Sequence, residues 1–274
     1  MAAVNIPLLD IADTETRQRP SAQPLVVAAL VAAVCRAISV YSARTMSGTM
    51  TMPGGWEMSM AWMRMPGQSR IGAAAMFLTM WQLMMVAMML PSTMPVALLY
   101  RRFAAARRRR GEAAAPVAVL LAGYFSTWLL FGVVAYVVGV GLSDAAMRDE
   151  RASKLVPAAT AFALILAGVY QLTPWKRVCL RHCRSPLSFV ATCWKPGWLG
   201  TLRLGSHHGA YCAGCCWGLM LIQLAIGVMN LSLMAVLAGV IWIEKSWRHG
   251  EQMARAAGAA AIAAGAIMAV TSAI

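Results

Sequence analysis

The segment from Ile71 to Glu112 reads IGAAAMFLTMWQLMMVAMMLPSTMPVALLYRRFAAARRRRGE, and it decides the class of fold. Its first part, residues 71–99, is apolar and long enough to cross the roughly 30 Å hydrocarbon core of a bilayer as a helix. Pro91 and Pro95 are expected to kink its end. An arginine-rich run follows directly, which is typical of a loop on the cytoplasmic side of a membrane. The segment therefore predicts a membrane helix that ends at the cytoplasmic face.

The whole chain has the composition of a polytopic membrane protein. Of its residues 60% are hydrophobic and 12% are charged, against about a quarter charged in an average soluble domain. The net charge of +14 would suit a nucleic-acid-binding protein. The basic residues, however, lie in short loops between apolar runs, where they orient the chain in a membrane. We therefore expect contact with the lipid bilayer and none with nucleic acid.

The apolar runs predict an all-α polytopic membrane protein with about seven transmembrane helices, and six as the alternative. The count depends on the run from Tyr211 to Ile243, which would form a helix of about 50 Å if it were continuous. A break near Gly227 to Asn230 gives seven spans, because glycine and asparagine end or cap helices. The predicted spans are residues 25–43, 71–99, 116–141, 156–174, 210–228, 230–247 and 252–272.

The spans and the basic loops together predict the domain organisation. Residues 1–24 are expected to form a polar cytoplasmic tail, and residues 25–274 a single transmembrane helical domain. Within that domain, residues 44–70 form a methionine-rich outer loop. Residues 175–216 form a segment that is rich in cysteine, histidine and basic residues and lies on the cytoplasmic side.

Cysteine and histidine gather at the cytoplasmic end of two predicted spans. The string CLRHC contains Cys179 and Cys183, and HHGAYCAGCCWGLM runs from His207 to Met220. If the second string is helical, its cysteines share one face by i, i+3, i+4 spacing, and Met220 is next on that face. The two strings lie on the same side of the membrane, so we expect them to meet. The expected metal ligands are Cys179, Cys183, Cys212, Cys215, Cys216, His182, His207, His208 and Met220.

Thiolate and imidazole ligands suit Cu(I), with Zn²⁺ as the alternative. Nearby lysine and arginine residues are expected to lower the pKa of the thiols and so to favour the thiolate that binds metal. Two uses without a metal stay open. Cys215 and Cys216 are adjacent and could act as a redox pair, or the cysteines are simply buried or palmitoylated. Structural disulfides are not expected on the reducing side of the membrane.

Methionine is dense in two places. In the outer loop a hydrophilic, glycine-rich segment has no core to fill, so its thioethers are expected to capture Cu(I), a soft ion. The alternative is an apolar loop that lies on the bilayer surface. The loop methionines are Met46, Met50, Met52, Met58, Met60, Met63 and Met65.

The second group of methionines lies on the span at residues 71–99. It could relay the metal inward or simply fill the core. Its members are Met76, Met80, Met84 and Met88, which are spaced by four, and Met85 and Met89 in a second row with Trp81; of these, Met80, Met84, Met85, Met88 and Met89 are the candidates for a relay. Two polar residues also lie in or near predicted spans. Glu244 is expected to be an oxygen ligand or the partner of Lys245, and Asn230 lies at the expected helix break.

Four strings together resemble a bacterial family known as domain of unknown function 2182, which is described as predicted metal-binding integral membrane proteins. They are WQLMMVAMMLPSTMP, YQLTPWKRVCLRHCRSPLSF, HHGAYCAGCCWGLM and GVMNLSLM with the later EK. The resemblance covers about residues 70–250 and leaves the outer methionine loop outside the shared motifs. It implies that the family's motif positions are Cys179, Cys183, His208, Cys212, Cys215 and Cys216.

The favoured function is Cu(I) handling in a bacterial inner (cytoplasmic) membrane by a multi-pass protein with a cytoplasmic N-terminus. The metal would be taken up, transferred or delivered to a copper-dependent partner protein. One alternative is a metal- or dithiol-dependent membrane oxidoreductase, and another is a structural zinc site that clamps two spans together. No carboxylate pair, Ser–His–Asp set or phosphate-binding loop stands out, so catalysis is not expected.

Overall fold

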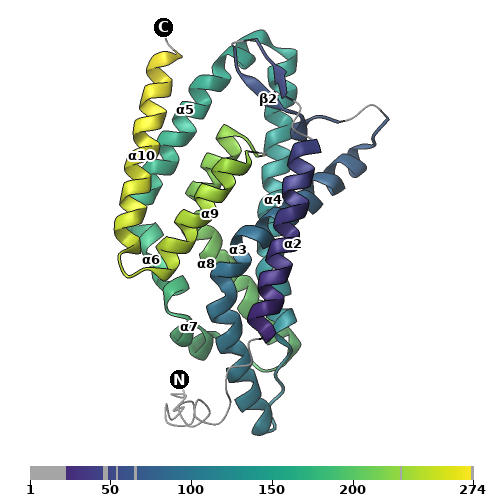
Figure 1. The fold of residues 1–274 in the computed structure, drawn as a ribbon, viewed down its shortest axis with the longest axis vertical. Coiled ribbons are helices and arrows are strands. Elements are labelled where there is room, and N and C mark those ends of the chain that lie inside the picture. Colours follow the sequence, from purple (N-terminus) through teal and green to yellow (C-terminus); the bar gives the residue numbers. More distant parts are fainter. Residues whose placement is uncertain (1–22, 46–48, 54, 65–66, 229, 273–274) are drawn as a thin grey trace.

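The computed structural model describes residues 23–45, 49–53, 55–64, 67–228 and 230–272. The chain is all-α, as expected, apart from one short hairpin (Figure 1). The predicted tail at residues 1–24 lies almost wholly outside the described residues. The helices are α2 (Gln23–Thr45), α3 (Arg70–Arg109), α4 (Val117–Arg148), α5 (Glu150–Leu172), α6 (Pro174–Arg184), α7 (Pro186–Cys193), α8 (Gly197–Ile226), α9 (Leu231–Ser246) and α10 (Gly250–Thr271).

Within the described part of the chain, five helices are long and apolar enough to cross a membrane: α3, α4, α5, α8 and α10. Two of the seven predicted spans differ from these. The apolar stretch of α2 is limited to Val26–Ser42, and α9 has only 16 residues. The number of seven spans is therefore not confirmed, whereas the multi-helix class is.

The chain breaks between α8 and α9 at the predicted place. Gly227 ends α8 with a φ of 148°, a conformation that L side chains rarely adopt. The side chain of Gln223 donates to the carbonyl oxygen of Gly227 at 3.0 Å. Asn230 caps α9, because its side-chain oxygen accepts a hydrogen bond from the amide of Leu233 at 3.0 Å. These contacts satisfy backbone groups at the turn and let α9 fold back onto the bundle.

The helices run roughly along the long axis of the molecule, with α10 beside α5 and with α9 between that pair and α3 (Figure 1). Helix α4 packs along α8. Both of these close pairs use small residues. A Cβ at Gly168 of α5 would lie 2.6 Å from the carbonyl oxygen of Gly258 of α10. A Cβ at Gly123 of α4 would overlap the backbone carbonyl of Leu202 of α8. Helices approach this closely only where a side chain is missing.

The hairpin pairs β1 (Thr49–Thr51) with β2 (Glu57–Ser59) in antiparallel fashion and leads into a single turn, η1 (Met60–Trp62). It is fixed to the junction of α4 and α5. The Ser153 hydroxyl donates to the carbonyl of Pro53 at 2.6 Å. The indole of Trp56 donates to the carbonyl of Ser153 at 3.0 Å. The hairpin and η1, the described parts of the 44–70 segment, are therefore folded and packed against the α4–α5 junction.

The close contact of α4 with α8 predicts that adding one methyl group at Gly123 destabilises the protein. Gly123→Ala should lower the free energy of unfolding by about 1–3 kcal/mol, because the new Cβ meets backbone that cannot move aside. On the same helix, a Cβ at Gly141 would meet nothing within 4 Å. Gly141→Ala should therefore be neutral or stabilising by up to about 1 kcal/mol. Thermal unfolding in detergent measures both, and equal midpoints would contradict the close packing.

Candidate metal centre

Three thiols of α8 form the centre of the candidate site. Cys212, Cys215 and Cys216 are buried, and their sulfur atoms lie within 4.8 Å of one another. The Sγ atoms of Cys215 and Cys216 are 3.4 Å apart. The i, i+3, i+4 spacing predicted that these residues share a face, and the helical conformation of α8 produces it.

A fourth thiol comes from the other cysteine string. The Sγ of Cys183, on α6, lies 3.8 Å from the Sγ of Cys215. The two strings therefore meet as expected. Cys179, one turn earlier on α6, packs against α8 at Gly214, where a Cβ would lie 2.9 Å from its sulfur. Cys183 joins the three thiols of α8 through its 3.8 Å contact with Cys215, and no such sulfur–sulfur contact is found for Cys179 among the described residues. We call Cys183, Cys212, Cys215 and Cys216 the thiol group.

The three expected histidine ligands are distributed differently. His208 is buried one turn before Cys212, its ring centroid lies 5.5 Å from that of Tyr124, and its Nδ1 has no hydrogen-bond partner. Because it is buried and lies one helical turn from Cys212, His208 remains a candidate ligand. His207 is exposed. His182 stacks on Tyr211 at 4.2 Å and hydrogen-bonds through Nδ1 with the carbonyl of Val178. Neither of these two is brought to the thiol group.

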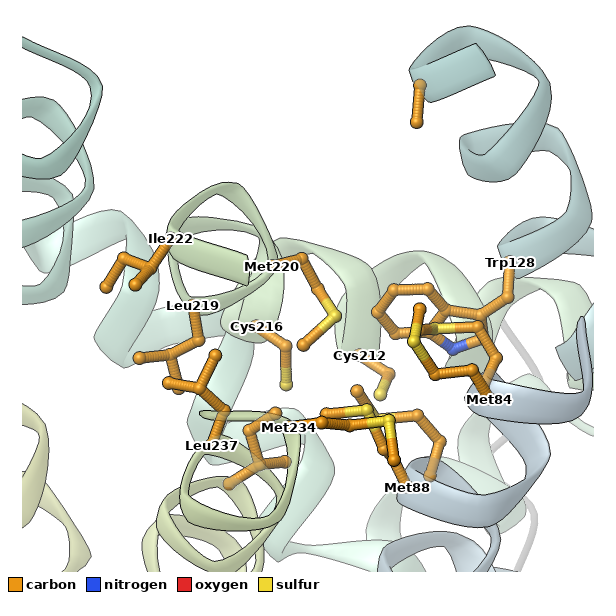
Figure 2. Close-up of a cluster of buried hydrophobic side chains, with 14 of the residues drawn as sticks. Met84, Met88, Trp128, Cys212, Cys216, Leu219, Met220, Ile222, Met234 and Leu237 are labelled. Atoms are coloured by element: carbon orange, nitrogen blue, oxygen red, sulfur yellow. The ribbon is translucent and has the colours of Figure 1, made fainter. Parts of the chain in front are cut away.

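Thioethers from three helices surround the thiols (Figure 2). Met84 and Met88 come from α3, Met220 from α8 and Met234 from α9. All four are buried in one cluster with Cys212 and Cys216. Met85 and Met89 are buried in the same cluster, and Met80 packs against it. Sequence reasoning missed Met234, because a single methionine in an apolar helix carries no signal.

Lys245 is the second residue that sequence reasoning missed. Its Nζ lies 3.0 Å from the Sγ of Cys212 and 3.3 Å from the hydroxyl oxygen of Ser92. The hydroxyl of Tyr124 lies 2.8 Å from the same sulfur. The ammonium thus supplies a positive charge beside a sulfur that carries negative charge when it ligates a metal.

Glu244 does not pair with Lys245, so that expectation is wrong. Its carboxylate accepts from Lys176 Nζ of α6 at 2.7 Å, and both side chains are buried. Lys176 also donates to the side chain of Gln171, on α5. Adjacent residues on a helix point about 100° apart, so Glu244 and Lys245 reach different neighbours. The other polar residue that we singled out, Asn230, has a structural role as the cap of α9.

The outer methionines do not form one group. Met52 and Met58 are buried against Ala146 and Val156, where they fill a small hydrophobic cluster. Met63, directly after η1, is partly buried and packs against the same cluster. Met50, in contrast, is 42% exposed. Met46 and Met65 lie outside the described residues, and so does the side chain of Met60.

The thiols of α6 do not have the lowered pKa that basic neighbours were expected to produce, because at Cys183 other effects outweigh the charge of Lys245. Burial raises the pKa of Cys179. The pKa of Cys183 is raised as well, chiefly by its interaction with the Cys212 thiol. Arg184, next to Cys183 in sequence, donates to the carbonyl oxygen of Trp247 at 2.6 Å. The two thiols are therefore protonated at neutral pH without a metal, and metal binding must displace protons.

The buried ion pair predicts a clear asymmetry. Lys176→Met alone leaves the Glu244 carboxylate buried and unpaired, and it should cost about 3–5 kcal/mol of unfolding free energy. Adding Glu244→Leu should recover a large part of that loss. The control is the exposed pair of Lys154 and Glu150, 2.7 Å apart, where Lys154→Met should cost less than about 1 kcal/mol. Chemical denaturation in detergent gives the values, and additive losses in the double variant would refute the pairing.

Comparison with known proteins agrees with the chemistry of the site. The model of one protein family, PpoB2, described as a copper chaperone, matches residues 78–268. This range contains the thiol group, Lys245 and the surrounding methionines, and it leaves out α2 and the hairpin. Neither the curated proteins nor the solved structures gave a match. The resemblance to domain of unknown function 2182 is supported in that a family covers this region, but not by that name. The chain belongs to the PpoB2 copper chaperone family.

Proposed function

We propose that the protein is an integral membrane copper chaperone that holds Cu(I) in the thiol group and delivers it to a copper-dependent partner protein. One observation carries the proposal: four thiols and several thioethers converge on one buried place. Such a donor set is soft throughout, which favours Cu(I) over hard cations. Membership of a copper chaperone family supports the same metal.

Charge distinguishes Cu(I) from zinc at this site. Cu(I) held by two thiolates has a net charge of −1, and the Lys245 ammonium 3.0 Å from Cys212 balances it. Zn²⁺ held by four thiolates has a net charge of −2, which would leave one negative charge uncompensated among buried side chains. Uncompensated charge inside a protein is costly. Thioether sulfur, moreover, is a ligand for soft ions and not for zinc.

The membrane assignment rests on the five membrane-length helices and on the basic ends of the bundle. We place the protein in a bacterial inner membrane with the arginine-rich end of α3 in the cytoplasm. The 175–216 segment, with Cys179, Cys183 and its histidines, would then lie toward the reducing side of the membrane. Cu(I) and free thiols are stable on that side. Met84 and Met88, with Met80, Met85 and Met89 beside them, are the proposed relay along α3.

Metal content of the purified protein tests the proposal. Cells that express the wild-type chain are grown with added copper or zinc, and the metal is measured by mass spectrometry after purification in detergent. We expect stoichiometric copper, lost in Cys212→Ser/Cys215→Ser/Cys216→Ser. The control is Cys35→Ser/Cys193→Ser, because those two thiols lie on α2 and α7, outside the thiol group. Stoichiometric zinc would instead support a structural clamp. Metal-free protein with an oxidised Cys215–Cys216 pair would support a dithiol enzyme.

The role of Lys245 gives a second prediction. Lys245→Met should weaken Cu(I) retention against a competing chelator by about 10–100-fold, the usual effect of losing a group that supports a metal ligand. Lys245→Arg keeps the charge and should retain most of the affinity. Lys154→Met, which removes an exposed lysine of α5, is the control. Equal retention by all three variants would show that Lys245 does not balance the metal site.

A further inference from the structure

A second set of soft ligands lines a pocket at the other end of the methionine series. The pocket lies between η1, the first turns of α3 and the part of α4 around Tyr136, and it opens to the surface. Three methionines line it, Met63, Met76 and Met80, together with three aromatic rings, Trp62, Phe77 and Tyr136. It contains none of the residues of the thiol group.

The pocket has a fixed geometry. Met76 and Met80 are four residues apart on α3, so they lie on one face of that helix. Met63 follows η1, and the neighbouring Trp62 holds that segment in place. The ring of Trp62 lies 5.1 Å from that of Phe77, and it occupies space that only a glycine leaves free, since a Cβ at Gly139 of α4 would overlap the indole. Phe77 in turn lies 5.1 Å from Tyr136.

The composition of the pocket selects a soft monovalent cation. Its lining contains no carboxylate, so hard divalent cations lack the oxygen ligands that they prefer. Thioethers bind Cu(I) without losing a proton, and aromatic faces attract cations. Filling of a core does not explain Met76, which is 39% exposed. Met80 and Met63 are partly buried and also pack against the neighbouring hydrophobic clusters. Met52 and Met58, in contrast, are buried at 7% and 2% exposure in the hairpin cluster.

We propose that Met63, Met76 and Met80 form a second Cu(I) site, which receives the ion before it reaches the thiol group. This inference rests on the proposed function, in which the thiol group binds the Cu(I) that leaves the outer site. Met80, Met84 and Met88 lie on successive turns of α3, about 6 Å apart along the axis. Met84 and Met88 already lie beside Cys212 (Figure 2). Thiolates bind Cu(I) more tightly than neutral thioethers do, so the ion moves toward the thiol group.

The first test uses Ag(I), a soft monovalent probe that is stable in air, and a chain without the inner site. In a chain in which all seven free cysteines are replaced by serine, Cys35→Ser/Cys179→Ser/Cys183→Ser/Cys193→Ser/Cys212→Ser/Cys215→Ser/Cys216→Ser, we expect equilibrium dialysis to show stoichiometric binding of Ag(I). Adding Met63→Leu/Met76→Leu/Met80→Leu should abolish it, whereas adding Met50→Leu/Met147→Leu/Met253→Leu should not. Leucine conserves the volume of methionine, so the fold should survive, and unchanged helicity and elution volume verify this.

A second readout locates the ion in the seven-serine chain, where no thiol competes for it. Bound Ag(I) blocks the lone pairs that peroxide attacks, so it should slow sulfoxide formation at Met76 more than tenfold. Met50, which is similarly exposed at 42% against 39% for Met76, should be oxidised at the same rate with or without Ag(I). Peptide mass spectrometry measures both rates.

The failure of this inference differs from the failure of the proposed function. If the seven-serine chain binds no Ag(I), or binds it equally with and without the three outer methionines, the outer site does not exist. Equal oxidation rates at Met76 with and without Ag(I) would also overturn it. Both results are independent of whether the wild-type thiol group contains copper, which the metal analysis decides.

Discussion

Lys245 reaches Cys212 only because the chain reverses direction between Gly227 and Asn230. A continuous helix would place these two residues about 50 Å apart, since 33 residues separate them at 1.5 Å each. With the reversal, the ammonium lies 3.0 Å from the sulfur. The turn depends on a glycine with a φ of 148° and on the side chain of Gln223, which donates to the turn carbonyls. The composition of the metal site therefore depends on one backbone turn far from it in sequence.

Two adjacent residues of α9, Glu244 and Lys245, contact different neighbouring helices. Glu244 pairs with Lys176 of α6, and Lys245 turns toward α8 and the thiol group. Because the first pair is neutral in sum and buried, it fixes the end of α9 without adding net charge to the interior. The second lysine has the Cys212 sulfur and the Ser92 hydroxyl as its partners, and its charge is balanced when that sulfur is a thiolate. This arrangement is the one that the proposed binding of Cu(I) by the thiol group requires.

Much of this arrangement could be predicted from the sequence. Apolar length and basic loops predict the long helices, and the spacing of Cys212, Cys215 and Cys216 predicts their shared face. The sequence predicts the helix break before α9. It does not predict the register in which α9 packs against α8 and α3. The register of α9 places Met234 and Lys245 beside the thiol group. It also places Glu244 within ion-pair distance of Lys176. The burial of two loop methionines could not be predicted for a similar reason. Met52 and Met58 pack against apolar residues at the α4–α5 junction, and no local sequence pattern indicates that contact.

X-ray absorption spectroscopy at the copper edge, on the copper-loaded wild-type protein in detergent, tests the central claim most directly. The account predicts a Cu(I) edge and a first coordination shell made of sulfur alone, with two or three ligands. Nitrogen ligands beside sulfur would bring His208 into the site and require a different charge balance at Lys245. A Cu(II) edge with a shell of nitrogen and oxygen would contradict the claim that the thiol group holds the metal.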